Sequence, residues 1–298
     1  MALIQTLRFI AEHPLNRGNP GKALFGFIKW QIGSRLVPGP IVMNWVNGSR
    51  VIVRRGETGL TGNLYCGLHE FWEMAYVLHA VSSEDLFVDV GANVGSYTVL
   101  ACAAKGAKGI CFEPVPTTYK RLLDNISLNS LVGRVEAHNV GLAEISGELV
   151  FTSEENCTNH VVPSELGAGA LKTVRVPVTT LDEALEGRSP SVMKIDVEGF
   201  ELPVIRGSHV TLRNSTLHSV IMELNGSGAR YEFNEHEIVD IMCHYGFLPY
   251  VYEPFSRELK PLDGKKSQSG NTLFIRNLQA VKEIISNAPP ASIRDIQL

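Results

Sequence analysis

The fold of this 298-residue chain is decided by the stretch Phe87-Val88-Asp89-Val90-Gly91-Ala92-Asn93-Val94-Gly95-Ser96-Tyr97. An apolar segment that stops at an acid predicts a buried strand, and the Gly-x-x-x-Gly turn predicts a close approach between the backbone and a ligand. Ser96 is a typical residue for the start of a helix. A strand, a glycine turn and a helix in this order are typical of an α/β sheet that binds an adenosine-containing molecule.

The spacing of polar residues around this turn distinguishes two such molecules. A nicotinamide site needs a second glycine where Asn93 stands and a third where Ser96 stands, so its pyrophosphate cradle is poorly formed here. Glu113 ends a second apolar strand, Gly109–Phe112, and is placed to accept the two ribose hydroxyls. S-adenosylmethionine has no phosphate, and its positive groups suit Asp89. A turn that binds nothing is the alternative.

Alternating apolar strands and amphipathic helices from residue 81 to 286 predict one α/β domain with a parallel sheet and helices on both faces. Residues 1–80 predict an extension of helices and a hairpin, in which Asn47-Gly48 joins two strands. Residues 287–298, with Pro289-Pro290, predict a poorly ordered tail. Strand-like segments at 147–152 and 174–178 predict a β insertion. We expect the polar loop 153–172 between them to form a lid.

Polar residues stop five of the predicted strands. They are Asp89, Glu113, Asn139, Asp196 and Glu223. In an open α/β sheet, ligands bind outside the carboxyl ends of the strands, so we expect these side chains to share one cleft. Asn139 is therefore a further candidate for cofactor binding, beside Gly91, Asn93 and Gly95 in the turn.

The stretch Lys194-Ile195-Asp196-Val197-Glu198-Gly199-Phe200-Glu201 carries the second candidate site. Alternation predicts Asp196 and Glu198 on one side of an extended turn, where they could act as a general base or, with Glu223, bind a divalent cation. Asp196, nearest the sheet, is the stronger candidate. Both acids could instead only accept hydrogen bonds from loop amides. Glu201 is expected to open the next helix.

Two weaker candidates, His69 and Glu70, lie in the segment that precedes the first core strand. His69 has a side chain that can act as a base at neutral pH, although its position favours an ordinary surface or N-cap role. Glu70 could bond the amino or ribose groups of the cofactor.

Composition limits the class of partner. Residues 1–60 hold eight basic and two acidic residues, a net charge of +6, so the remainder of the chain carries −10. This asymmetry indicates either a solvated basic face or peripheral contact with an anionic membrane, and the overall acidity argues against nucleic acid. Five scattered cysteines and the absence of a signal peptide or long apolar run favour a reducing cytoplasm. The oligomeric state is not readable from the sequence.

The joint pattern resembles the FkbM family of S-adenosylmethionine-dependent methyltransferases. The resemblance rests on Gly59-Leu60-x-Gly62-Asn63 and Tyr65-x-Gly67-x-x-Glu70, on Val88–Tyr97, on Phe112-Glu113-Pro114 and on Lys194–Glu201. It implies a class I methyltransferase fold and methylation of a hydroxyl on a sugar, a glycan or a secondary metabolite. A nicotinamide-dependent oxidoreductase and a non-catalytic cofactor-binding scaffold are the competing interpretations.

Overall fold

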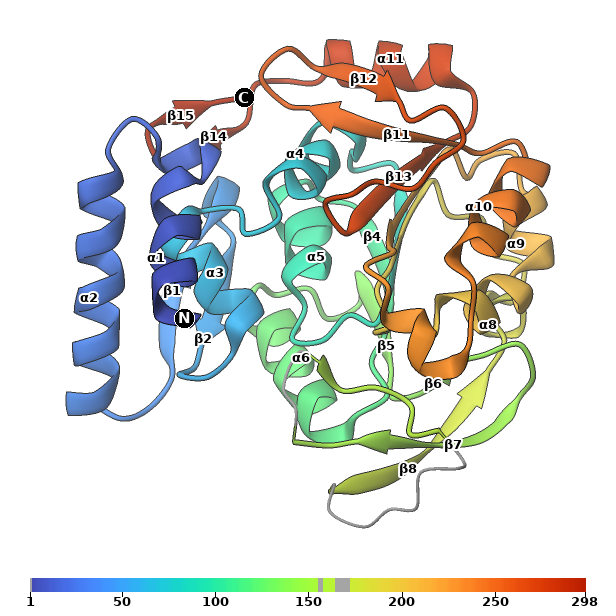
Figure 1. Cartoon of the computed structure of the whole chain (residues 1–298), viewed down its shortest axis with the longest axis horizontal. Helices are drawn as coiled ribbons and strands as arrows, with labels where there is room; N and C mark the ends of the chain where they lie inside the picture. Colours follow the sequence, from blue (N-terminus) through green and yellow to red (C-terminus); the bar gives the residue numbers. More distant parts are fainter. Residues whose placement is uncertain (1, 155–157, 164–171) are drawn as a thin grey trace.

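The computed structural model describes residues 2–154, 158–163 and 172–298, and a single large sheet runs through its centre (Figure 1). The strand order is β12-β11-β13-β10-β9-β3-β4-β5. The bounds are β3 Leu86–Val90, β4 Lys108–Phe112, β5 Val135–His138, β9 Val192–Ile195, β10 Ser219–Glu223, β11 Leu248–Glu253, β12 Glu258–Pro261 and β13 Asn271–Ile275.

The pairing of these strands creates a crevice at one point of the sheet. The chain builds outward from β3 through β4 to β5, then returns to the other side of β3 with β9 and β10, all in parallel. β13 inserts antiparallel between β10 and β11. The order of strands reverses between β3 and β9, which is where ligands bind in such sheets. This is the class I methyltransferase arrangement, and it confirms the predicted fold class.

Helices cover both faces of the sheet, as predicted (Figure 1). Alternation along β3 sends Phe87 into the core on one face and Val88 and Val90 into the core on the other. The first face is covered by α4 Phe71–Ala80, α5 Ser96–Val99, its continuation η3 Leu100–Ala104, α6 Pro116–Leu128 and α11 Leu278–Asn287. The second is covered by α7 Leu181–Leu185, α8 Glu201–Arg206, α9 His209–Arg213 and α10 Glu235–His244. The short helix η5 Ser227–Tyr231 follows β10.

The N-terminal segment contains the predicted helices and hairpin. Its elements are α1 Ala2–Glu12, η1 Pro14–Asn16, α2 Pro20–Leu36, β1 Ile41–Asn44, η2 Val46–Gly48, β2 Arg50–Val53 and α3 Thr58–Cys66, of which α3 was not predicted. β1 and β2 pair antiparallel. The backbone amides of Arg50 and Ile52 donate to the side-chain oxygens of Asn129 and Asn125, each at 2.8 Å. The segment is therefore attached to α6, although its boundary as a separate unit stays a prediction.

The β insertion forms as expected. β6 Gly141–Leu142, β7 Gly147–Thr152 and β8 Thr173–Thr179 make a small sheet in the order β6-β8-β7. Most of the loop predicted as a lid, residues 155–157 and 164–171, lies outside the described residues.

The prediction of a poorly ordered C-terminal tail was wrong. β14 Ser292–Ile293 and β15 Ile296–Gln297 form a hairpin with Ile293 and Leu298 buried. The Arg294 guanidinium donates to Asn16 Oδ1 at 3.0 Å and to the Leu64 carbonyl at 2.8 Å. Two prolines suggested a chain end without structure, but the apolar residues beyond them pack against the N-terminal segment.

Candidate active site

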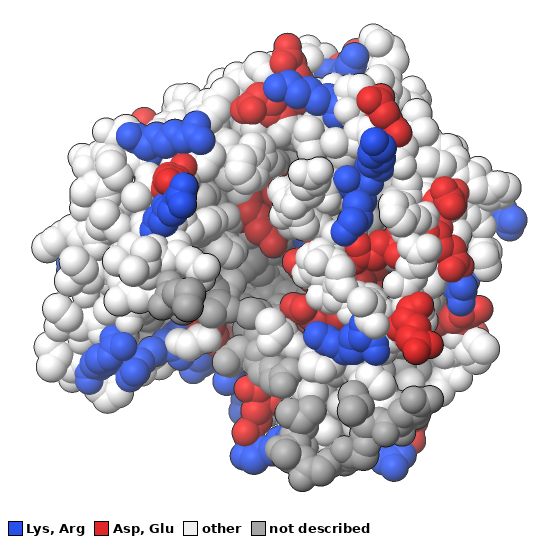
Figure 2. Space-filling model, in the orientation of Figure 1, with Lys and Arg blue, Asp and Glu red and all other residues white. Residues whose placement is uncertain are grey.

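A cavity of about 250 Å³ opens at the carboxyl ends of β3, β9 and β10, below α3 and α4. Figure 2 shows the corresponding hollow near the centre of the molecule, with acidic side chains inside it. We call it the transfer cavity. The predicted site residues that line it are His69, Glu70, Asp89, Gly91, Asn93, Asp196, Glu198 and Glu223. Side chains that are far apart in the sequence thus meet where the strand order reverses.

A smaller cavity of about 50 Å³ adjoins the first and shares Gly91, Asn93, Asp196 and Glu198 with it. Glu113 lines only this smaller cavity, together with Val140 and Phe151. The turn after β3 therefore separates two compartments, one beside Asp196 and one beside Glu113.

Gly95 and Asn139 line neither cavity, so the structure places them behind the residues that form the cavity walls. Gly95 has φ 92°, and a Cβ there would lie 2.7 Å from Leu122 Cδ1, so its glycine is needed for packing on α6. The Asn139 amide donates to the carbonyls of Glu113 and Pro114 at 2.8 and 2.9 Å. Asn139 positions the loop that carries Glu113.

Gly91 is required by close contact with the opposite loop. Its φ is 78°, and a Cβ would lie 1.8 Å from the Asp196 carbonyl oxygen. Asn93, also in the turn, has φ 51°. Because residues with side chains rarely adopt this region, and Asn tolerates it better than most, the turn is built for backbone exposure toward the cavities.

Glu113 holds the turn in place. Its carboxylate accepts the amide protons of Asn93 and Val115 at 3.0 and 2.9 Å. Burial raises the pKa of Glu113 to about 7, against the lowering effect of these two amides. The predicted ribose-binding acid is thus also a structural partner of the glycine turn.

Asp89 is almost fully buried and accepts the Thr98 hydroxyl. Burial raises the pKa of Asp89 to about 6, and the Thr98 hydrogen bond lowers it in part. Thr98 lies on α5, nine residues after Asp89, and the sequence offered no signal for this contact. The bond fixes the direction of the carboxyl group at the cavity wall.

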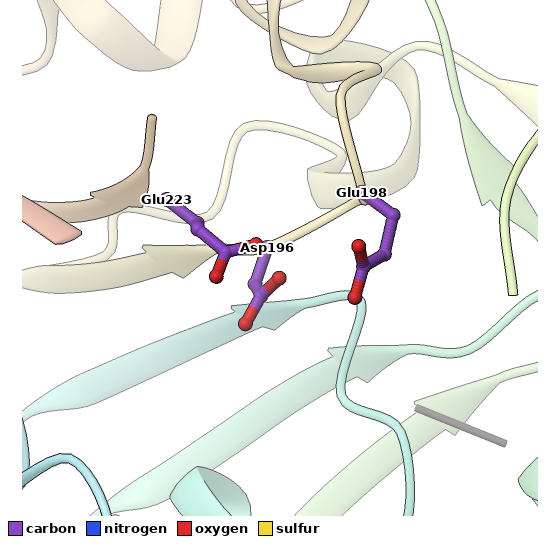
Figure 3. Close-up of side chains that lie close together, drawn as sticks. All are labelled: Asp196, Glu198 and Glu223. Atoms are coloured by element: carbon purple, nitrogen blue, oxygen red, sulfur yellow. The ribbon is translucent and has the colours of Figure 1, made fainter. Parts of the chain in front are cut away.

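Asp196, Glu198 and Glu223 converge at one side of the cavity (Figure 3). One oxygen from each lies within 4.8 Å of the others, and within the described residues this is the one such group of three with metal-ligating potential. Glu198 has φ 54°, an unfavourable backbone conformation for a glutamate, and it turns the side chain toward the other two acids.

The crowding of these acids changes their protonation. Burial, with the charges of Asp196 and Glu201, raises the pKa of Glu198 to about 7. Burial and Asp196 raise the pKa of Glu223 to about 9, so Glu223 is protonated at neutral pH. Three carboxyl groups at this spacing therefore carry at least one proton between them.

Lys194 also lines this cavity and was not predicted as a site residue. Its side chain is 1% exposed, and Nζ donates to Asp196 Oδ2 at 3.0 Å and Asn271 Oδ1 at 3.1 Å. Burial opposes its charge, yet Asp196, Glu70 and Glu223 together raise the pKa of Lys194 above its usual range. A lone lysine in the apolar strand β9 was the available signal.

Glu70 and His69 reach the cavity from the segment before α4. The Tyr97 hydroxyl donates to Glu70 Oε2. The His69 ring packs over Gly62, where a Cβ would lie 2.2 Å from Nδ1, and Nδ1 itself is buried without a hydrogen-bond partner in the described structure. Burial lowers the pKa of His69, so its imidazole is neutral at pH 7. Both residues face the cavity as predicted; Tyr97 was not predicted as a site residue.

Comparison with known proteins identifies the family of this chain. The sequence matches the methyltransferase FkbM domain over residues 89–249, which is more than half of the chain and contains the turn after β3, Glu113 and the three clustered acids. A class I methyltransferase sheet with this match defines the class of protein. The chain belongs to the FkbM methyltransferase family.

Two curated relatives bear methyltransferase names. Hexuronic acid methyltransferase AglP of Haloferax volcanii is 33% identical over 151 residues, which cover 50% of this chain and 59% of the relative. Methyltransferase sdnD of Sordaria araneosa is 28% identical over 170 residues, which cover 46% and 65%. The matched region spans less than two thirds of either relative.

Among solved structures, the methyltransferase FkbM from Methylobacillus flagellatus is similar with a TM-score of 0.44 and 15% identity, over 72% of this chain and 52% of that one. A SAM-dependent O-methyltransferase from Thermotoga maritima gives a TM-score of 0.38 and 12% identity, over 76% of this chain and 66% of that one.

Proposed function

We propose that this protein transfers a methyl group from S-adenosylmethionine to a hydroxyl of a sugar, a glycan or a secondary metabolite. The observation that carries the proposal is the convergence of Asp89, the Gly91 turn and the acids Asp196 and Glu198 in one cavity at the point where the strand order reverses. Family membership adds the reaction class. It also argues against the nicotinamide-dependent alternative.

The residues present fit the cofactor. The Gly91 turn brings bare backbone to the cavity wall, and Glu70 and Asp196 present carboxylates to a cavity that would hold an ammonium and a sulfonium. We propose that Glu113 accepts the ribose hydroxyls from the adjoining compartment, with Asn139 and Gly95 supporting that loop and turn from behind. When bound, S-adenosylmethionine supplies an electrophilic methyl group on its sulfonium.

The chain itself has to orient the acceptor hydroxyl and take its proton. We propose that Asp196 is the proton acceptor, because the Lys194 ammonium holds its carboxylate in a fixed direction beside the cavity. Glu198 is the neighbouring group best matched to receive that proton near neutral pH, since its pKa is about 7. His69, neutral and facing the same cavity, is the alternative base.

A divalent cation on Asp196, Glu198 and Glu223 is the alternative to proton transfer within the protein. The three oxygens have a suitable spacing, but the Lys194 ammonium already supplies positive charge to Asp196. Dialysis against a chelator separates the two routes. We expect transfer to survive chelation; loss of activity that magnesium or manganese restores would establish the cation instead.

The test of the proposed function measures binding and transfer separately. S-adenosylhomocysteine should raise the thermal midpoint of the protein and NAD should not. Incubation with labelled S-adenosylmethionine and a panel of glycans and small alcohols should then give a labelled ether. Binding without transfer to any acceptor would favour the scaffold interpretation, and stabilisation by NAD alone would favour the oxidoreductase.

Hexuronic acids are the first acceptors to test, because that is the substrate class named for one relative. Mass spectrometry of glycans from cells with and without the protein extends the search to larger acceptors. A mass difference of one methyl group at a sugar hydroxyl is the expected result; a methyl group on nitrogen or carbon would contradict the O-methyl assignment.

We also propose peripheral contact between the N-terminal helices and an anionic membrane. α1 and α2 expose apolar side chains such as Ile4, Phe25 and Leu36, while Lys22 and Lys29 lie among them in the sequence. No helix of the described residues is long and apolar enough to span a bilayer. α1 is amphipathic, and amphipathic helices with exposed apolar side chains lie flat in the membrane interface.

Vesicle sedimentation tests the membrane contact. Vesicles with anionic lipid should retain the protein, neutral vesicles should retain less, and Phe25→Ser should weaken retention. Equal retention on both vesicles would contradict the proposal.

A cytoplasmic location is likewise proposed, on the ground that Cys66, Cys102, Cys111 and Cys243 are all free thiols.

A further inference from the structure

A third cavity, of about 420 Å³, lies between α4 and the strands β11, β12 and β13. We call it the aromatic cavity, and its characteristic lining residues are Trp72, Tyr76, Tyr250, Tyr252, Glu73 and Asn271. None of them was singled out by the sequence, and the transfer cavity shares none of them. Binding sites for small molecules combine such apolar walls with a few polar groups.

Two tyrosines form a fixed wall of this cavity. The Tyr76 hydroxyl bonds Ser219 Oγ at 2.5 Å, and the Tyr252 hydroxyl bonds His79 Nδ1 at 2.6 Å. Their rings pack edge to face with centroids 5.3 Å apart. Both side chains are almost inaccessible to solvent, with Tyr76 0% and Tyr252 3% exposed, so they form a rigid floor beneath the cavity, and the exposed aromatic face belongs to Trp72.

Trp72 stands at the exposed side of the same cavity. It lies in the first turn of α4 and is 42% exposed, while its neighbour Phe71 is buried in the core. Core packing therefore does not explain a tryptophan at this position. A large flat ring at the mouth of a cavity is suited to stacking against a ligand ring.

Polar groups face the aromatic wall. Burial and the charge of Glu70 raise the pKa of Glu73 to about 7, so this carboxyl can donate as well as accept a hydrogen bond at neutral pH. Ser267 and Ser269 also line the cavity, with their hydroxyls 2.7 Å apart. The cavity therefore offers both donors and acceptors opposite a carbon surface.

Asn271 connects the aromatic cavity to the transfer cavity. Its side chain lines the former, and its Oδ1 accepts the ammonium proton of Lys194, which lines the latter, at 3.1 Å. The same ammonium holds Asp196. One hydrogen-bonded pair thus lies between the two cavities.

We propose that the aromatic cavity is a subsite for a sugar unit of the acceptor. A sugar ring has a carbon face that matches the exposed ring of Trp72 and a rim of hydroxyls that matches Glu73 and the two serines. A purely apolar ligand would not use the hydrogen-bonding capacity of Glu73, and a phosphate would face the carboxyls of Glu73 and Glu253 with Lys260 as the one cation among the described lining residues. The subsite rests on the proposed methyl transfer to a sugar and specifies where such an acceptor is held.

The test measures sugar binding apart from catalysis. The full chain is saturated with S-adenosylhomocysteine, and saturation-transfer NMR then measures the binding of methyl glucoside, methyl glucuronide and cyclohexanol. Cyclohexanol has a six-membered ring with one hydroxyl and therefore lacks the hydroxyl rim of a sugar. We expect at least one glycoside to bind and cyclohexanol to bind more weakly. Trp72→Ala should weaken the glycoside about tenfold, as the loss of one stacked ring predicts, while Trp72→Phe retains most of it.

The control is Val210→Ala, which removes an exposed apolar side chain from α9, on the face of the sheet opposite to α4. S-adenosylhomocysteine binding, measured by calorimetry, should be unchanged in every variant, which shows that each is folded. Equal glycoside binding in Trp72→Ala and wild type, stronger binding of cyclohexanol, or no glycoside signal at all would overturn the subsite. A protein that binds glycosides but not S-adenosylhomocysteine would instead overturn the proposed function and leave the subsite standing.

Discussion

The Lys194 ammonium lies 3.0 Å from Asp196 Oδ2 at the end of the same strand, β9, with the lysine buried and the aspartate facing the cavity. Alternation places both side chains on the face covered by α4 and α5, while Met193 and Ile195 point to the opposite core. The cation–π contact of Lys194 with the Tyr97 ring, 5.3 Å from its centroid, joins this pair to the turn after β3. The site is therefore organised around one buried cation among several carboxyl groups.

Asp196→Asn tests the proton acceptor. The amide keeps the size and the hydrogen bond near Lys194 but cannot take a proton, so methyl transfer should fall by about 100-fold or more. Binding of S-adenosylhomocysteine, followed by calorimetry, should change little. Asp240→Asn, an exposed acid on α10, is the matched control and should behave as wild type. Wild-type turnover in Asp196→Asn would exclude Asp196 as base or as an essential metal ligand.

Lys194→Met tests the buried cation. The change removes the buried counter-charge that Asp196 and Glu70 share, and we expect the free energy of unfolding to drop by about 3 kcal/mol. Adding Asp196→Asn should recover part of the loss, because one of the repelling carboxylates is then neutral. Urea unfolding measures both, with the exposed Lys282→Met as control. Full stability of the single variant would show that the pair contributes little.

Glu113→Ala tests the second compartment. We expect the dissociation constant for S-adenosylhomocysteine to rise several-fold, about tenfold, because the variant loses the ribose acceptor and releases the Asn93 amide that shapes the turn. Glu113→Gln keeps one acceptor oxygen, so its dissociation constant should lie between those of the wild type and Glu113→Ala. An unaltered constant for Glu113→Ala in calorimetry would count against the ribose role.

Gly91→Ala tests the close approach of the turn and the β9 loop. The added Cβ would meet the Asp196 carbonyl at 1.8 Å and would occupy a left-handed backbone conformation, so the two loops must separate. We expect lost cofactor binding together with a lower thermal midpoint. Gly26→Ala, in α2 with open space around it, should leave both unchanged. Intact binding in Gly91→Ala would show that the turn adapts.

Stability should depend on pH through the buried acids. The pKa values of Glu113 and Glu201 are raised from about 4.5 to about 7, so their contribution is fully present below 4.5 and is lost as pH rises through about 7. Burial lowers the pKa of His13 and His79 to about 4, so their contribution is present above 6.5 and is lost as pH falls toward 4. The thermal midpoint of the ligand-free protein should therefore be higher at pH 6.5 than at pH 8. A higher midpoint at pH 8, at constant ionic strength, would contradict these shifts.

Most of the fold could be read from local pattern. The apolar run before Asp89, the Asn47-Gly48 turn and the alternation of strands and helices each report a local preference that the packed structure keeps. Helix α3 was missed because its glycines are poor helix formers, and it forms against the hydrophobic cluster that contains Leu60 and Tyr65. The C-terminal hairpin was missed because its stability comes from contacts with Asn16 and Leu64, far away in the sequence.

The sequence by itself determined the chemistry available at the strand ends: a glycine turn beside Asp89, an acid after the second strand, and the pair Asp196 and Glu198, because these follow from which residues stop an apolar run. Only the tertiary structure decided which groups share a cavity. It placed Gly95 and Asn139 behind the site, added Lys194 and Tyr97 to it, and opened the aromatic cavity beside Asn271. The physical reason is that burial and charge pairing depend on which strands and helices are neighbours in space, and that is a property of the packed sheet rather than of any single segment.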